Sequence, residues 1–200
     1  MAARVPTDYE FDAFISYSHS GVVKPWVQGF FYPYLRDWLS QTMGGHQARV
    51  FVDAEEIDIG RRWPQYVRDA LLTSKCLVSV LSGDYFFRPW CYSEWTNFVE
   101  REDALGLDIT RESLIVPVIH NDGKYFPARA NEYQPLDFKG CRSSSGNFQN
   151  HPNFPLFEGK IERLAEAVAT TADRAPGFDP GWPVLEIDPL RRTVPLMRIS

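Results

Sequence analysis

Short apolar runs alternate with amphipathic stretches along most of the chain, and this alternation limits the fold more than any other feature. Five runs have the length and composition of strands: 11–16, 49–53, 76–81, 114–119 and 135–138. Between and after them, apolar residues recur every three or four positions, as on one helix face, around 26–39, 63–71, 91–102 and 161–168. Strands joined by helices form parallel sheets, because a parallel crossover needs a long connection. The sequence therefore predicts an α/β fold with an open parallel sheet of about five strands and helices on both faces.

This order of elements is that of flavodoxin-like folds, and local signals divide the chain into one domain with two flanking segments. Gly44 and Gly45 predict the end of the first helix, and Pro64 suits the first turn of the second. Five of the 15 prolines lie beyond residue 175, where no helical or strand period is visible. We expect a flexible N-terminus at 1–8, one domain at 9–172 and a proline-rich tail or linker at 173–200.

Composition and charge narrow the class of partner. The net charge of −5 argues against nucleic acid, whose phosphates need a concentrated basic surface. Apolar runs such as 114–119 are only strand-length, which predicts no membrane span and a cytoplasmic location. The three cysteines, Cys76, Cys91 and Cys141, form no CxxC pair, and we expect free thiols.

The ends of the predicted strands collect the residues that could carry chemistry. In an open parallel sheet, ligands bind beyond the carboxyl ends of the strands. Ser16 ends the first strand, and Ser18 and His19 follow it. Asp53 ends the second strand, and Ser82 with the segment 84–94 follows the third. One edge of the sheet should therefore hold hydroxyls, carboxylates and aromatic rings.

Three segments within this arrangement resemble the Toll/interleukin-1 receptor (TIR) domain family. The run FDAFISYS at 11–18 resembles the first TIR box, and VFVD at 50–53, followed by a loop with Gly60, resembles the second strand and its BB loop. The segment WCYSE at 90–94 is similar to the W-C-x-x-E motif, whose glutamate is catalytic in NAD-cleaving members. The resemblance spans about 9–172 and implies a bacterial NAD-cleaving TIR domain with Glu94 as its catalytic carboxylate. The region 121–155 is long for the family, and its role is left open.

A single carboxylate suits that reaction. Hydrolysis of an ordinary glycoside usually takes two carboxyl groups, one of which protonates the leaving group. The nicotinamide of NAD is already cationic and leaves neutral, so one carboxylate near the ribose can stabilise the positive transition state. Glu94 would act in this way, with NAD as the substrate and no bound cofactor. The candidate substrate-binding residues are Phe14, Ser16, Tyr17, Ser18, His19, Asp53, Trp90 and Cys91.

Each of these residues also has a purely structural interpretation. Glu94 could be an acidic residue in the first turn of a helix that favours the dipole, and Asp53 could fix a turn. Phe14 and Trp90 could be core residues, and Cys91 a small buried apolar group. No zinc-like spacing, G-x-G-x-x-G or P-loop motif occurs, so the sequence predicts no metal site and no dinucleotide cofactor.

Two functional hypotheses remain, and the presence of Glu94 discriminates between them. The first is an NAD⁺ glycohydrolase or ADP-ribosyl cyclase, which the resemblance associates with anti-phage immunity, self-assembly of TIR domains and a sensor domain or partner protein. The loop 54–62, with Ile57, Ile59 and Gly60, is the candidate assembly loop. The second is a non-catalytic TIR adaptor, a class that generally lacks this glutamate. A receiver or flavin protein of the same architecture is disfavoured, because 17–19 carries no acidic pair.

Overall fold

Five parallel strands form the central sheet of the computed structural model, in the order β2-β1-β3-β4-β5. The structure describes residues 6–53, 65–123, 126–182 and 184–185. The strands are β1 (Phe11–Tyr17), β2 (Val50–Val52), β3 (Ser74–Leu81), β4 (Ile115–Ile119) and β5 (Leu136–Asp137). All five predicted strands are present, and the strand order is that of a flavodoxin-like sheet, as expected.

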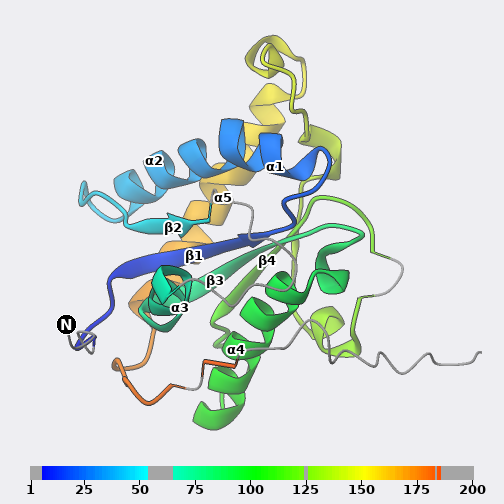
Figure 1. Ribbon diagram of the computed structural model, residues 1–200. Coiled ribbons are helices and arrows are strands. Elements are labelled where there is room, and N and C mark those ends of the chain that lie inside the picture. The colour runs from blue at the N-terminus through cyan, green and yellow to red at the C-terminus, as the bar shows by residue number, and fades with distance from the viewer. Residues whose placement is uncertain (1–5, 54–64, 124–125, 183, 186–200) are drawn as a thin grey trace, which may run out of the picture.

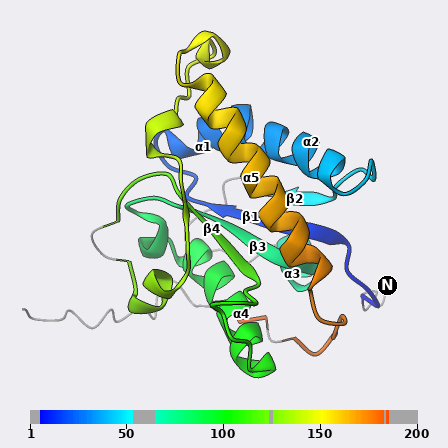
Figure 2. The ribbon, with the colours of Figure 1, turned by 180° about the vertical axis from the view of Figure 1, so that it is seen from behind.

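Helices cover both faces of this sheet (Figures 1 and 2). One face carries α1 (Val23–Trp26), the π-helical stretch η1 (Val27–Phe31), α2 (Tyr32–Thr42) and α5 (Phe154–Asp173). The other face carries α3 (Gln65–Leu72) and α4 (Pro89–Leu105). Short 3₁₀ turns lie in the connections: η2 (Tyr85–Phe87), η3 (Ala128–Glu132), η4 (Lys139–Cys141) and η5 (Phe148–Asn150).

The first predicted helix is longer than its apolar pattern and contains a π-helical turn. Its parts α1, η1 and α2 follow one another directly, and the π-helical turn ends at Phe31, two residues before Pro33. Proline has no amide hydrogen to donate to the carbonyl four residues earlier, which favours a local change of helix pitch. The helix ends at Thr42, and Gly44 and Gly45 both have positive φ, as the glycine pair predicts.

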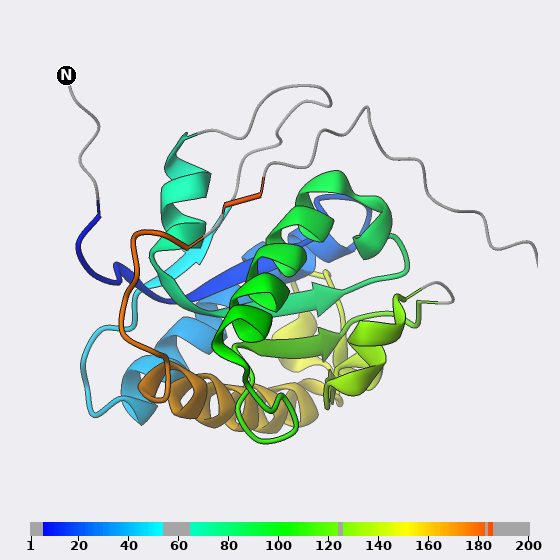
Figure 3. The same cartoon turned by 90° about the horizontal axis from the view of Figure 1, so that it is seen from below.

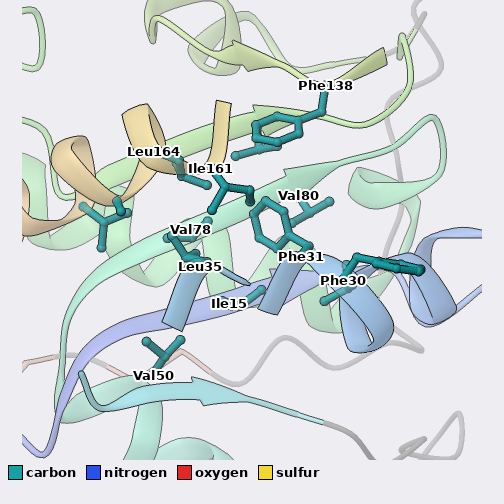
Figure 4. Packing of buried hydrophobic residues seen from close by; sticks show 14 of the residues in the cluster. Ile15, Phe30, Phe31, Leu35, Val50, Val78, Val80, Phe138, Ile161 and Leu164 are labelled. Carbon is teal, nitrogen blue, oxygen red and sulfur yellow. The ribbon is translucent and has the colours of Figure 1, made fainter. Parts of the chain in front are cut away.

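Two apolar clusters hold the layers together because alternate strand residues face opposite sides of the sheet. Ile15 and Val78 point toward α2 and α5, where they join Phe31, Leu35 and Leu164 (Figure 4). The region 121–155 adds to this cluster, since Phe138, Cys141 and Phe148 are buried in it. Phe14, Leu77 and Leu81 point the other way, toward α3 and α4.

Buried polar contacts fix the C-terminal half of α4, at the amino ends of the strands. Arg101 donates from its two terminal nitrogens to the carbonyl oxygens of Leu71 (2.7 Å) and Ser74 (3.3 Å). Glu102 accepts from the amide of Leu114 at 2.7 Å and from the hydroxyl of Tyr133. The carboxylate of Glu102 and the two terminal nitrogens of Arg101 are therefore paired with neighbouring elements, while the buried Nε of Arg101 has no hydrogen-bond partner among the described residues.

Apart from Asp173, which ends α5, the described part of the predicted tail has no helix or strand, and it lies against the domain. Figure 3 shows it running from the end of α5 back toward α3 and α4. Phe178 makes an edge-on contact with Tyr9, with ring centroids 5.3 Å apart. Leu185 donates its amide to Asn97 Oδ1 at 2.7 Å and accepts from Asn97 Nδ2 at 3.3 Å.

Candidate functional site

The site forms where β1, β2 and β3 end, beside the beginning of α4. Because the strands are parallel, the residues that follow them meet at one edge of the sheet, as the sequence predicts. Glu94 lies in the second turn of α4 and not in the first, since the helix already begins at Pro89. The interpretation of Glu94 as a charge that favours the helix dipole loses support, because that effect fades beyond the first turn.

Glu94 is bonded to the first strand. Ser16 Oγ donates to Glu94 Oε2 across 2.5 Å, and the same Oγ lies 2.6 Å from the hydroxyl of Tyr85. Ser16 shares a strand face with Phe14, the face that α4 covers, so alternation along β1 aims its hydroxyl at the helix. All three side chains are buried, with Glu94 only 7% exposed.

Burial controls the ionisation of this carboxyl. Removal from water raises the pKa of Glu94 to about 8; the hydrogen bond from Ser16 opposes the rise and the charge of Asp53 adds to it. Burial likewise raises the pKa of Tyr17 to about 12, so its phenol stays neutral. At neutral pH Glu94 is therefore mostly protonated, and its poorly hydrated charged form gains from a nearby positive charge, a property frequent at catalytic sites.

Tyr17 and Asp53 lie together on the β2 side of the site. The hydroxyl of Tyr17 donates to the backbone carbonyl of Asp53 at 2.7 Å and accepts from Gln28 Nε2 at 3.2 Å. The carboxylate of Asp53 accepts from the hydroxyl of Tyr66 at 3.3 Å. The ring of His19 lies against that of Tyr17, with centroids 4.5 Å apart.

Ser18 belongs to a polar hub around Asp84, which joins the loops after β1 and β3 to the start of α4. The carboxylate of Asp84 accepts from Ser18 and Ser82 at 2.8 and 2.7 Å, and from Ser20 and Arg88 at 2.5 and 3.0 Å. Burial works to raise the pKa of Asp84, but these four donors hold it well below the ordinary value. The hub therefore stays charged and fixes the spacing of the three segments.

Phe14, Trp90 and Cys91 lie at different depths beneath this edge. Phe14 is fully buried and stacks on Phe51, so it packs in the core and offers no exposed face in this structure. Trp90 is half-buried at the start of α4. Cys91 is a buried free thiol, like Cys76 and Cys141, as predicted, and burial raises the pKa of Cys91 well above its ordinary value.

Two residues at this edge of the sheet were not among the site residues predicted from the sequence. Tyr85 lies within the segment 84–94, but nothing in the sequence marks it as a partner of Ser16. His120 follows β4 and is 1% exposed; burial, with help from the Arg142 charge, lowers its pKa to about 4. Its position directly after a predicted strand was the available signal, and the neutral ring packs edge-on against Trp26.

The candidate assembly residues Ile57, Ile59 and Gly60 lie outside the described residues. Within the described ranges, no cluster of three or more histidine, cysteine or acidic side chains could hold a metal ion. None of the helices in that part of the chain is long and apolar enough to cross a membrane.

Comparisons with known proteins place this geometry in a family. A family model described as TIR domain matches residues 14–150, more than half of the chain. The chain belongs to the TIR domain family. The match includes the last part of β1, all of β2 and β3, and the motif that carries Glu94. No curated protein matches the chain.

Solved TIR domains are among the structures that the chain is similar to. One is the TIR domain of the Toll-related receptor TRR-2 from Hydra magnipapillata, at 16% identity and a TM-score of 0.46, covering 78% of this chain and 98% of that one. Another is the TIR domains of the activated Roq1 resistosome, which directly recognises the pathogen effector XopQ, at 19% identity and a TM-score of 0.40, covering 83% and 86%. At these identities and TM-scores, neither neighbour bears on the activity of this TIR domain.

Proposed function

We propose that this TIR domain is an NAD⁺ nucleosidase, with Glu94 as the catalytic carboxylate. The observation that carries the proposal is the environment of Glu94: a buried carboxyl at the carboxyl edge of a parallel sheet, bonded to Ser16 and with a pKa raised to about 8. A group of this kind gains most when positive charge develops beside it, because little water is present to screen the attraction. The bond broken would be the one between nicotinamide and ribose, with ADP-ribose or cyclic ADP-ribose as product.

The proposed reaction needs few other groups from the protein. Nicotinamide departs as a neutral group, so the site needs no acid to protonate it. The oxocarbenium-like ribose needs a negative group close by, and Glu94 would supply this as well as a hydrogen bond to the ribose hydroxyls. Water, or a group of the adenine for the cyclic product, would then attack the anomeric carbon.

Surrounding residues have proposed roles that fit their positions. Asp53, Tyr17 and His19 lie on the β2 side of Glu94, where they would bind the polar part of the dinucleotide. Trp90 is half-buried and would be the stacking platform, a role that the buried ring of Phe14 does not fill in this structure. Ser16 and Ser18 hold Glu94 and Asp84, so they would act on the substrate through those carboxylates.

An immune role and regulation by assembly are part of the proposal. Self-association with other TIR domains, with Ile57, Ile59 and Gly60 in the contact, would switch on an anti-phage effector, and a sensor domain or partner protein would trigger it. The competing function is an adaptor that acts by TIR–TIR contact alone. The buried Glu94 and its bond to Ser16 favour the enzyme, since an adaptor has no use for a desolvated carboxylate that costs stability.

Incubation with NAD decides between these functions. The purified chain, at low and at high protein concentration, is incubated with NAD and the products are separated by chromatography. Release of nicotinamide together with ADP-ribose or its cyclic form supports the enzyme. Intact NAD at every protein concentration, in a folded sample that self-associates, supports the adaptor.

A further inference from the structure

A buried tyrosine lies behind the proposed catalytic carboxylate. Tyr85 belongs to η2, between β3 and α4, and its side chain is fully buried. Its hydroxyl lies 2.6 Å from Ser16 Oγ, which in turn lies 2.5 Å from Glu94 Oε2. The three groups come from three different elements and form one chain of hydrogen bonds.

The direction of this chain follows from a proton inventory. A serine hydroxyl has one hydrogen, and Ser16 gives it to Glu94 when that carboxyl is charged, because a carboxylate can only accept. The bond between Ser16 and Tyr85 then has the phenol as donor, and burial raises the pKa of Tyr85 well above its ordinary value, so the phenol keeps its proton. In the reverse order the hydrogen of Tyr85 would find no acceptor among the described residues. The chain therefore runs from Tyr85 to Ser16 to Glu94.

A hydroxyl that accepts a hydrogen bond becomes a stronger donor in its own bond, and the effect is larger where water is scarce. We propose that Tyr85 is a positioning residue, which directs the proton of Ser16 toward Glu94 and so favours the charged form of that carboxylate. Tyr85 itself does not touch the substrate. This inference rests on the proposed function only for its link to catalysis; its effect on the ionisation of Glu94 is independent of any reaction.

The other described groups near Glu94 do not supply this help. Asp53, at the end of β2, is an acidic neighbour and opposes a second negative charge. Tyr17 on β1 and Cys91 on α4 also interact electrostatically with Glu94, but burial raises the pKa of each, so both are neutral. Among the described residues, the bond from Ser16 is thus the contribution that favours ionised Glu94, and Tyr85 reinforces it.

The test measures the titration of Glu94 directly. The ¹³C signal of the Glu94 carboxyl carbon, assigned by its loss in Glu94→Gln, is followed against pH in the wild type and in Tyr85→Phe and Ser16→Ala. Tyr133→Phe is the matched control, since it also deletes a buried phenol that donates to a glutamate of α4, but at Glu102. We expect Tyr85→Phe to raise the pKa of Glu94 by roughly 0.5 to 1 unit, Ser16→Ala to raise it further, and Tyr133→Phe to leave it unchanged.

Kinetics supply a second readout that loss of packing would not reproduce. In Tyr85→Phe, kcat/KM for NAD should fall about three- to tenfold at pH 7 and return toward the wild-type value near pH 9, because each unit of pKa is a factor of ten in the charged fraction. A loss that is equal at both pH values would mean a merely structural role and would overturn the inference.

The titration also separates the two proposals. An unshifted Glu94 signal in Tyr85→Phe, or an equal shift in Tyr133→Phe, overturns the role of Tyr85 whatever the protein does to NAD. A wild-type protein that leaves NAD intact overturns the proposed function, while the titration still decides the role of Tyr85. If Tyr85→Phe does not fold, an unshifted pKa in Ser16→Ala overturns the inference, because the chain passes through that hydroxyl.

Discussion

Ser16 and Glu94 are 78 positions apart in the sequence, yet the serine hydroxyl donates to the glutamate carboxylate across 2.5 Å. The contact joins β1 to α4, and both side chains are buried. This one hydrogen bond joins the first TIR-like segment, 11–18, to the last one, 90–94, so segments that are far apart in the sequence contribute to one site.

Glu94→Gln should abolish NAD cleavage, with at least a hundredfold loss of turnover, and leave the fold intact. The amide keeps the size of the side chain and removes the charge that would face the ribose, and loss of one such electrostatic group costs about two to three orders of magnitude in rate. Turnover and circular dichroism are measured together. Glu100→Gln, an exposed change on the same helix, is the control and should keep full activity. Wild-type turnover in a folded Glu94→Gln protein would rule out the mechanism.

The same substitution should stabilise the protein at high pH. Burial raises the pKa of Glu94 from 4.5 to about 8, so between these values the folded state binds its proton more tightly than the unfolded chain does. Stability from this group is therefore present at low pH and is lost as pH rises from about 4.5 to about 8. We expect the Tm of Glu94→Gln to exceed that of the wild type by roughly 10 °C at pH 8.5, and the difference to vanish near pH 4. A gap that is constant with pH contradicts the burial argument.

Substitution of the cysteines should spare most of the activity. Cys76, Cys91 and Cys141 are buried free thiols, and burial raises the pKa of each, so none forms a reactive thiolate at neutral pH. Single serine variants should keep more than about half of the wild-type kcat/KM, since the proposed reaction uses no covalent sulfur. Rapid and complete loss of activity in Cys91→Ser, with the fold retained, would point to a different enzyme class.

Specific activity should rise steeply with protein concentration if assembly through the loop 54–62 turns the enzyme on. This loop joins β2 to α3, so a contact there could change access to Glu94. Gly60→Pro restricts the backbone of the loop and should remove the rise. Activity is compared over a hundredfold range of concentration. A flat dependence, the same in wild type and Gly60→Pro, would exclude this mode of activation.

The contact between Asn97 and Leu185 should contribute measurably to stability. Asn97 is fully buried and bonds to both backbone polar groups of Leu185, so Asn97→Ala leaves those groups without their partner. We expect a loss of about 1 to 3 kcal/mol in urea unfolding. In a chain ending at residue 173 the same substitution should cost clearly less, because Leu185 is absent. Equal costs in the two backgrounds would mean that the segment adds nothing through Asn97.

The sheet was predictable from the sequence because its signals are local. Each strand is a run of apolar residues between helical patterns, and the observed strand bounds differ from the predicted ones by two residues at most, at the start of β3. The π-helical stretch beside Pro33 and the start of α4 at Pro89 were less visible, since both depend on backbone bonds that apolar spacing does not report.

The site was predictable as a set of positions but not as a network. The rule for carboxyl ends of parallel strands placed Ser16, Asp53 and Glu94 at one edge, and the structure brings them there. No local pattern indicates that Tyr85 bonds to Ser16, because the two are 69 positions apart and the contact depends on how η2 packs. The docking of Leu185 on Asn97 is hidden for the same reason.

The attachment of Arg101 and Glu102 has a mechanical consequence for Glu94. Both residues form hydrogen bonds with the backbone of neighbouring elements. They lie about two helical turns from Glu94, roughly 11 Å along the same helix. A continuous α-helix is stiff over that length. A change of helix tilt at Arg101 and Glu102 therefore also moves Glu94. Loss of the Arg101 contacts with Leu71 and Ser74 would therefore displace Glu94 at the opposite edge of the sheet, in a variant whose proposed active-site residues are all intact.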